Sequence, residues 1–223
     1  MTPADWGVHV RDAVATRRSI RQFTDRPVPD ATIRDLLERA SRAPSGGNLQ
    51  PWRIYVLNGD SMARFRAVIA DRPATGGEYD IYPSPLWEPY RTNRYSNGEQ
   101  LYATLGIGRE DQAARLDQFA KNQGFFGAPA ALFCFIDRGM GPPQWSDLGM
   151  FLQTFMLLAR EAGIDTCPQE FWSVHHASVR EFVGAPDAEL LFCGMAIGHA
   201  DPAAPVNTLV SDRMPVDDWA TFV

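Results

Sequence analysis

The residues from 147 to 162 (DLGMFLQTFMLLAREA) constrain the fold of this chain more than any other segment. They predict a helix with so few polar side chains that it must be buried on most sides, in the core of a domain or of a dimer. Gly163 follows directly, as is typical of a helix end. No apolar run in the sequence approaches the length of about 18 residues that a membrane span needs. The segment therefore indicates a water-soluble protein with a large core.

The composition of the 223-residue chain is that of an ordinary globular protein, with 45% apolar and 22% charged residues. The net charge of −6 argues against nucleic acid or an anionic membrane as the main partner. The sequence has no internal repeat and no linker, so we predict a single domain over residues 1–223. The first ten residues lack the apolar core of a signal peptide, which favours a cytoplasmic protein.

The cysteines and histidines form no recognisable site. Cys134, Cys167 and Cys193 lie far apart in apolar stretches and lack the paired spacing of a disulfide framework or a zinc site. We therefore expect three buried structural thiols in a reducing compartment. His175 and His176 are neighbours, so on a helix they point about 100° apart and cannot hold one metal ion together. We expect no metal site.

Hydrophobic periodicity predicts more helices than strands. The clearest helix covers residues 30–40, where Asp30 is a suitable cap and Ile33, Leu36 and Ala40 share an apolar face. Other predicted elements are helices over 5–16, 61–70, 109–123, 147–162 and 174–183, strands over 53–57, 130–136, 165–169 and 190–197, and an extended C-terminal arm over 199–223. This pattern indicates an α+β or α/β domain.

Residues 73–98 combine several prolines and glycines with interleaved tyrosine and tryptophan side chains. A loop of this length inside a compact domain is usually functional or disordered. The aromatic side chains argue against simple disorder and favour a lid over a site. The alternative is a surface excursion that packs on its own rings.

Several common catalytic motifs are absent from the sequence. It contains no G-x-S-x-G nucleophile elbow, no G-x-x-x-x-G-K-[ST] phosphate loop, no H-E-x-x-H zinc motif and no G-x-G-x-x-G loop that opens a helix. The sequence therefore offers few residues that could catalyse hydrolysis by acid–base or metal chemistry.

Two polar segments remain as candidate sites. In an extended chain, Arg17, Ser19 and Arg21 of the segment RRSIR point to one face, where two guanidinium groups and a hydroxyl form a good cradle for a phosphate. A solvated basic patch is the alternative for this cluster. The segment APSGGNLQPW, residues 43–52, presents backbone groups, a hydroxyl and an amide between a predicted helix and a predicted strand. By itself it is equally compatible with a tight turn.

The two segments together resemble the FMN-dependent nitroreductase family, through R-R-S-x-R-x-F followed by A-P-S-x-x-N-x-Q-P-W. Two further segments agree in order and spacing. The segment Pro168-Gln169-Glu170-Phe171 resembles the family segment beside the flavin ring. The glycines of Gly194-x-x-x-Gly198, with Pro205 and Arg213-Met214-Pro215, resemble the family's C-terminal phosphate-binding end. The resemblance covers most of the chain, from residue 10 to residue 218.

The resemblance implies an α+β, nitroreductase-like fold, in which helices flank a mainly antiparallel central sheet, and an interlocked homodimer with two FMN sites between the subunits. By the same resemblance, the FMN phosphate is held by Arg17, Ser19 and Arg213, with Arg18 nearby, and Arg21 faces the pyrimidine end of the ring. The remaining implied contacts are Pro44, Ser45, Gly46 and Asn48 from the partner subunit, and Pro168, Gln169 and the backbone N–H near Glu170 beside the ring.

The implied activity is transfer of two electrons from NADH or NADPH, through FMN, to a nitroaromatic or similar electron-poor small molecule by ping-pong kinetics. No protein residue is expected to be catalytic, because the chemistry takes place on the flavin. One alternative is a non-catalytic FMN-binding or storage protein. Another is a flavin enzyme of the same fold that performs reductive dehalogenation or oxygen-dependent flavin cleavage.

Some positions depart from the family pattern or stay unassigned. Ser211 stands where many relatives carry a basic residue, and Phe171 and Trp172 are bulkier than the residue often found there, which puts the depth of the substrate pocket in doubt. A contact to flavin or substrate between residues 85 and 105 has three candidates, namely Arg91, Asn93 and Arg94.

Overall fold

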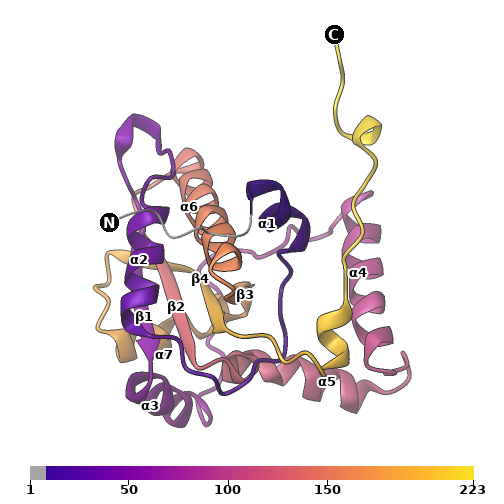
Figure 1. Ribbon diagram of the computed structural model, residues 1–223, viewed down its shortest axis with the longest axis horizontal. Coiled ribbons are helices and arrows are strands. Elements are labelled where there is room, and N and C mark those ends of the chain that lie inside the picture. Colours follow the sequence, from indigo (N-terminus) through magenta and orange to yellow (C-terminus); the bar gives the residue numbers. More distant parts are fainter. Residues whose placement is uncertain (1–8) are drawn as a thin grey trace.

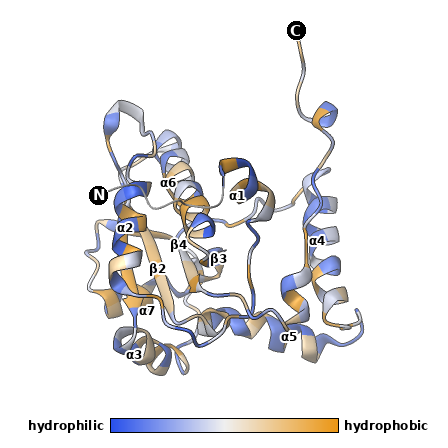
Figure 2. Cartoon of the chain, viewed as in Figure 1, coloured by the Kyte–Doolittle hydropathy of each residue, from blue (hydrophilic) through white to orange (hydrophobic). Residues whose placement is uncertain are grey.

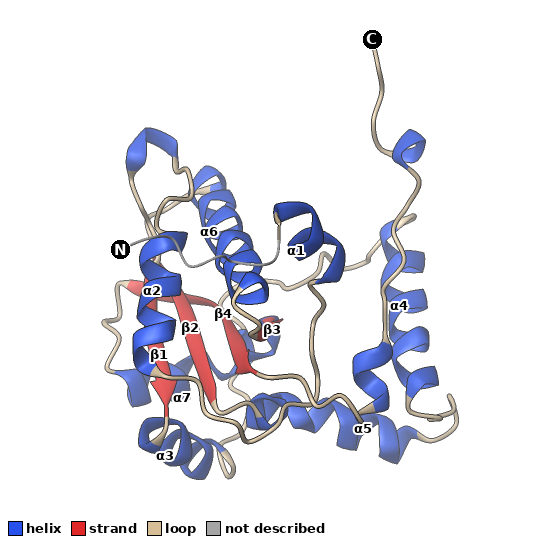
Figure 3. Ribbon diagram, in the orientation of Figure 1, coloured by secondary structure: helices blue, strands red, loops and turns tan. Residues whose placement is uncertain are grey.

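The computed structural model describes residues 9–223, and its centre is a four-stranded sheet (Figure 3). The strands are β1 (Arg53–Asn58), β2 (Ala130–Asp137), β3 (Asp165–Gln169) and β4 (Glu189–Gly198). Their order in the sheet is β1-β2-β4-β3, and every neighbouring pair is antiparallel. All four predicted strands are confirmed, with ends that shift by no more than one residue. The antiparallel sheet with its helices confirms the α+β class.

Seven α-helices accompany the sheet in the described part of the chain (Figure 1). They are α1 (Val10–Thr16), α2 (Asp30–Ala40), α3 (Asp60–Ile69), α4 (Tyr90–Thr104), α5 (Gln112–Ala120), α6 (Pro142–Glu161) and α7 (His176–Val183). The predicted helix over 5–16 is confirmed from Val10 onward, and its first residues lie outside the described range. Asp30 is the first residue of α2 rather than its cap, because Pro29 occupies the cap position.

The central strand β2 is buried on both faces, so its side chains alternate between two separate hydrophobic clusters. Ala131, Phe133 and Phe135 face a cluster that includes buried residues of α3 and α7. The intervening residues, Leu132, Cys134 and Ile136, face a second cluster built with α2 and α6. Figure 2 shows the strand as hydrophobic along its length. This double burial explains why 130–136 reads as a continuous apolar run.

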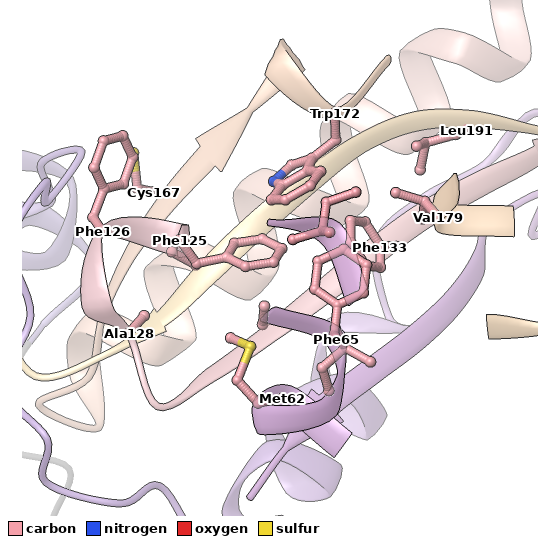
Figure 4. Packing of buried hydrophobic residues seen from close by; sticks show 14 of the residues in the cluster. Met62, Phe65, Phe125, Phe126, Ala128, Phe133, Cys167, Trp172, Val179 and Leu191 are labelled. Carbon is pink, nitrogen blue, oxygen red and sulfur yellow. The ribbon is translucent and has the colours of Figure 1, made fainter. Parts of the chain in front are cut away.

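The first cluster is organised around the indole of Trp172 (Figure 4). Its ring stacks on Phe125 at 4.6 Å between centroids and meets Phe133 edge-on at 5.4 Å. A Cβ on Gly194 of β4 would lie only 2.3 Å from the indole. Gly194 is therefore required by this packing. Trp172 belongs to the core, so of the two bulky residues only its neighbour Phe171 remains available to a site.

The apolar helix α6 begins at Pro142, earlier than predicted, because Gln144 Oε1 accepts a hydrogen bond from the backbone N–H of Gly141 (3.1 Å) and Pro142 occupies the first turn. One side of α6 packs into the second cluster through residues such as Phe151 and Phe155. The other side leaves Gly149, Met150 and Gln153 exposed. Within one chain the helix is thus only partly covered.

The segment 73–98 is a loop only as far as Pro89, and its last residues form the start of α4. The prediction of one continuous excursion was wrong there. The early part of the segment is fixed to the body of the protein, since Glu78 pairs with Arg138 and Arg180 and the Tyr79 hydroxyl donates to the Phe192 carbonyl. The segment is therefore held to the body of the protein at Glu78 and Tyr79 and continues into helix α4 at its other end.

Residues 199–223 contain no α-helix or strand, only 3-10 turns at Pro205–Thr208 and Val216–Asp218. Their course follows α4 and then leaves the body of the molecule (Figure 1). Near α4, Gln100 donates to Asp212 and Asn93 Nδ2 lies 3.1 Å from Met214 Sδ. Beyond these contacts the large side chains Trp219 and Phe222 are exposed. Among the described residues, no helix has the length and apolar character needed to cross a membrane.

Candidate functional site

The segment after α1 runs in extended conformation beside the edge strand β3. The backbone N–H of Ile20 donates to the Thr166 carbonyl (3.0 Å), and that of Thr24 donates to the His199 carbonyl (2.9 Å). The side chains of Ile20 and Phe23 are buried and hold the segment in place. Arg17 and Arg21, which are separated from each other by Arg18, Ser19 and Ile20, both act on the thiol of Cys167 in β3.

Arg17 and Arg213 bring two positive charges together from opposite ends of the sequence. The pKa of the Arg17 guanidinium is lowered, first because the group is half-buried and second because the charge of Arg213 acts on it. In residues 9–223 neither arginine pairs with a carboxylate, and the guanidinium of Arg213 donates only to the carbonyls of Ser211 and Asp212. Two like charges without a counter-ion fit an anion between them.

The thiol of Cys167 lies beneath this positive group. Its pKa is raised to about 11 by burial, although the charges of Arg21 and Arg17 act in the opposite direction. The thiol therefore stays protonated near neutral pH and is not a nucleophile. All three cysteines are buried and free, as predicted. No group of three or more His, Cys, Asp or Glu within residues 9–223 is placed to hold a metal ion.

Arg18 does not join this group. Its guanidinium donates to the Asn207 carbonyl (3.4 Å) and lines a separate hollow with Asp165 and Asp201. It lies on the other side of the extended segment from Arg17. The side chain of Asn207 fixes this part of the chain, since its Oδ1 accepts from the backbone N–H of Arg21 (2.9 Å).

Next to Arg21 the structure opens into a cavity of about 450 Å³. Its floor is the end of β3 and the turn after it, namely Pro168, Gln169, Glu170 and Phe171. Arg21 therefore joins the predicted segment at 168–170 in one cavity, although the two are far apart in the sequence.

One residue of the cavity lining, Gln169, carries a buried polar atom without a partner among the described residues. Gln169 Nε2 donates to the carbonyl and to the side-chain oxygen of Asn122, both at 3.0 Å. Its Oε1 is buried and accepts no hydrogen bond from the described residues. An unpaired buried acceptor costs about 1–3 kcal/mol, so this atom fits a ligand that carries an N–H donor.

Sequence reasoning missed one wall of the cavity, which comes from α5 and the 3-10 turn Lys121–Gly127 that follows it. Gln118, Phe119 and Asn122 all line the cavity. Gln118 is only 6% exposed. The four-residue spacing of Gln118 and Asn122 places two amides on one helical face, and this was the available signal.

The segment 73–98 contributes Ile81, Tyr82 and Arg94 to the same cavity. The guanidinium carbon of Arg94 lies 4.5 Å from the centre of the Tyr82 ring. The pKa of Glu170 is raised because the carboxyl is partly buried, while a hydrogen bond with Tyr82 acts in the opposite direction. The segment therefore lines the cavity in two places, through Ile81 and Tyr82 of its loop and through Arg94 of helix α4.

Of the three unassigned residues, only Arg94 lines this cavity. Asn93 lies with Arg213 and Met214 along a neighbouring hollow between α4 and the C-terminal residues. Arg91 forms an exposed ion pair with Glu88 at 2.7 Å.

The predicted contacts at 44–48 lie elsewhere in the single chain. They form an exposed turn around Gly46–Asn48, which Figure 1 places on the opposite side of the molecule from α4. The turn is built rigidly: Ser45 Oγ accepts from the backbone N–H of Gln50 (3.0 Å), and Asp147 accepts from that of Gly46 (3.3 Å). Asn48 adopts a φ of 58°, a conformation that asparagine tolerates. One chain alone does not bring this turn to the cavity.

The glycines at 194 and 198 are required by close packing. Gly194 faces Trp172, and a Cβ on Gly198 would lie 2.7 Å from Pro129 Cδ and 2.9 Å from Phe23 Cδ1. Both glycines are buried in β4. Their spacing is explained by close packing, so we do not count them as phosphate contacts.

Comparison with known proteins agrees with this geometry. Residues 14–199 match the model of the family described as Nitroreductase family. The chain is 38% identical over 219 residues to a nitrobenzene nitroreductase of Ectopseudomonas oleovorans, with 96% of each chain covered.

Two solved structures extend the comparison to three dimensions. The FMN- and NADPH-dependent nitroreductase NfnB of Sphigopyxis sp. strain HMH is 46% identical, with a TM-score of 0.93 over 97% of this chain and 99% of that one. The FMN-dependent nitroreductase NfnB of Mycobacterium smegmatis, solved in complex with NADPH, is 28% identical, with a TM-score of 0.90 over 96% and 97% of the two chains.

Proposed function

Because the chain belongs to the nitroreductase family, we propose that it is an FMN-dependent oxidoreductase that moves two electrons from NADH or NADPH to nitroaromatic or similar electron-poor compounds. The observation that carries this proposal is the pair of uncompensated charges on Arg17 and Arg213, close to Arg21 and its cavity. The named relatives use FMN and NADPH for the same kind of reaction.

FMN, when bound, supplies the chemistry by accepting a hydride and passing two electrons on. The protein's part is binding and orientation. Arg17, Ser19 and Arg213 would hold the phosphate, an anion that the two arginines lack among the described residues. Arg21 would place positive charge at the pyrimidine end of the ring. Gln169, whose Oε1 has no partner among the described residues, would accept a hydrogen bond from a ring N–H.

The rest of the cavity lining suits aromatic molecules. It includes Ile81 and Tyr82, and also Phe119 and Phe171, whose rings are 5.6 Å apart. A single slot of about 450 Å³ favours a ping-pong order, in which the nicotinamide leaves before the acceptor enters. Pro168 and Glu170 line the same slot, and the backbone N–H near Glu170 would complete the contacts beside the ring.

The exposed turn at 44–48 favours an interlocked homodimer. Pro44, Ser45, Gly46 and Asn48 would reach the flavin of the partner subunit, since they do not reach the cavity of their own chain. The C-terminal residues leave the body with exposed apolar side chains, and the outer edge of β1 borders a hollow of about 630 Å³. An open sheet edge and an exposed arm are complementary in a dimer.

The proposed function has a direct test. The purified protein is expected to be yellow and to release FMN rather than FAD on denaturation, and to oxidise NADH or NADPH when nitrobenzene is supplied. A colourless protein that takes up no added FMN would contradict the proposal. A yellow protein without turnover would instead be an FMN-storage protein, against which the open cavity argues.

Within the segment 73–98, we expect Tyr82→Ala to change the ranking of acceptor substrates, because Tyr82 lines the cavity. Trp87→Ala is the matched control, since Trp87 is exposed and packs edge-on against Tyr90 outside the cavity. FMN content should stay near wild type in both variants. Steady-state kinetics with several nitroaromatic acceptors measure the ranking. Equal changes in the substrate ranking of both variants would indicate that the segment has a structural role and is not a lid over the site.

A further inference from the structure

The two arginines of α4 differ in what surrounds them. Arg91 points to solvent and pairs with Glu88 at 2.7 Å. Arg94 lines the cavity that also contains Glu170 and Phe171. One turn of the same helix therefore presents one neutralised arginine and one that faces the proposed acceptor site.

The charge of Arg94 is not balanced by any described residue. Two other arginines nearby stack on tyrosine rings, and each also pairs with Glu99: Arg109 on Tyr95 and Arg115 on Tyr102. Arg94 stacks on Tyr82 in the same manner but has no ion pair and no hydrogen bond within residues 9–223. Within the described part of the chain, no carboxylate neutralises the guanidinium of Arg94.

The stacking fixes how Arg94 can bind an anion. The guanidinium carbon lies over the ring of Tyr82, and none of its N–H donors bonds to a described residue. This planar fork matches the two oxygens of a carboxylate. Glu170 lines the same cavity but forms no ion pair with Arg94. The neighbouring rings of Phe119 and Phe171 suit an aromatic body attached to that anion.

We propose that Arg94 recognises an anionic group on the acceptor, so that nitroaromatic carboxylates are the preferred substrates of this protein. The inference rests on the proposed function and names its substrate class. Arg94 acts here as a specificity-determining residue, because the electrons still pass through the same flavin site whether or not the acceptor is charged.

The test compares para-nitrobenzoate with para-nitrobenzamide, which has nearly the same shape but no charge. The measured quantity is the ratio of kcat/KM for the two acceptors, in the FMN-loaded wild-type enzyme and in three variants. We expect the ratio to fall about tenfold or more in Arg94→Gln, since a hydrogen bond between charged groups is lost. Arg94→Lys keeps the charge without the planar fork and should give an intermediate ratio. Arg91→Gln, on the same helix, should leave the ratio unchanged.

Each outcome decides the question. An unchanged ratio in Arg94→Gln, with both acceptors still reduced, would overturn the inference and leave the proposed function standing. A fall in kcat/KM for NADPH without a change in the acceptor ratio would assign Arg94 to the nucleotide phosphates and also overturn it. A wild-type enzyme that reduces neither acceptor would defeat the proposed function itself. Should Arg94→Gln not retain FMN, the ratio in Arg94→Lys decides.

Discussion

Replacing Arg17 or Arg213 with alanine is expected to weaken FMN binding by roughly 10- to 150-fold, because a hydrogen bond to a charged group contributes about 1.5–3 kcal/mol. The two guanidiniums repel each other in the protein alone, and a phosphate between them removes this repulsion. Ser19→Ala should have a smaller effect, since a hydroxyl carries no charge. Titration of the FMN-free protein with FMN, followed by flavin fluorescence, measures the change.

Riboflavin provides the control within the same experiment, because it has the ring of FMN but no phosphate. Its binding should change much less than that of FMN in both variants. Arg18→Ala is the matched protein control, since Arg18 carries the same charge one residue from Arg17 but bonds to the Asn207 carbonyl on the other side of the segment. Equal weakening of FMN binding and riboflavin binding would indicate that the cluster at 17–21 is a solvated basic patch.

The strands were predictable because the burial of their side chains is visible in the local pattern of apolar residues. In β2 both faces are covered, so every residue from Ala130 to Ile136 is apolar or small, and the run ends at the exposed Asp137. The extended segment at 17–21 was also readable, since alternation in a strand-like chain separates Arg17 from Arg18 without further knowledge.

The helix α4 was not predictable in the same way. None of its residues from Tyr90 to Thr104 is fully buried, and its sequence lacks a clear apolar face, as the largely hydrophilic colouring in Figure 2 shows. Its position depends on distant partners such as Asp212, which accepts from Gln100. Short-range periodicity carries no signal for contacts of this kind.

The cavity wall from α5 illustrates the same limit for the site. Gln118 and Asn122 were placed on a predicted helix, but only the folded chain brings them opposite Gln169. Conversely, the glycines of β4 matched a family pattern in sequence, whereas the structure explains Gly194 by the indole of Trp172. A motif match locates residues, and their neighbours in space decide their role.

We expect each FMN site to be shared between two chains. Helix α4, which lines the cavity through Arg94, and the exposed turn at Gly46–Asn48 lie on opposite sides of one chain (Figure 1). Within a dimer, the turn of one subunit would complete the cavity of the other. The exposed side of α6 at Met150 and the exposed α1 residues Val10 and Val14 supply apolar surface for such contact. Light scattering should therefore give twice the chain mass of 24.8 kDa.

Mixing two defective variants tests this sharing directly. Arg17→Ala removes a phosphate contact, and Asn48→Asp replaces an amide by a carboxylate of the same size in a backbone conformation that both residues tolerate. Each variant alone should bind FMN at least about tenfold more weakly than wild type. When the two are co-expressed with different tags, about half of the dimers are mixed.

In a mixed dimer, a site that draws Arg17 from one chain and Asn48 from the other occurs once with both substitutions and once with neither. About a quarter of all sites in the co-expressed sample should then bind FMN as tightly as wild type, although neither parent does. If each chain built its site alone, every site would carry one substitution and no tight class would appear. FMN titration of the doubly purified mixed dimer, in which half of the sites are expected to be tight, gives the sharpest form of this measurement. A single weak class there, or a monomeric wild-type protein that retains flavin, would refute the shared site.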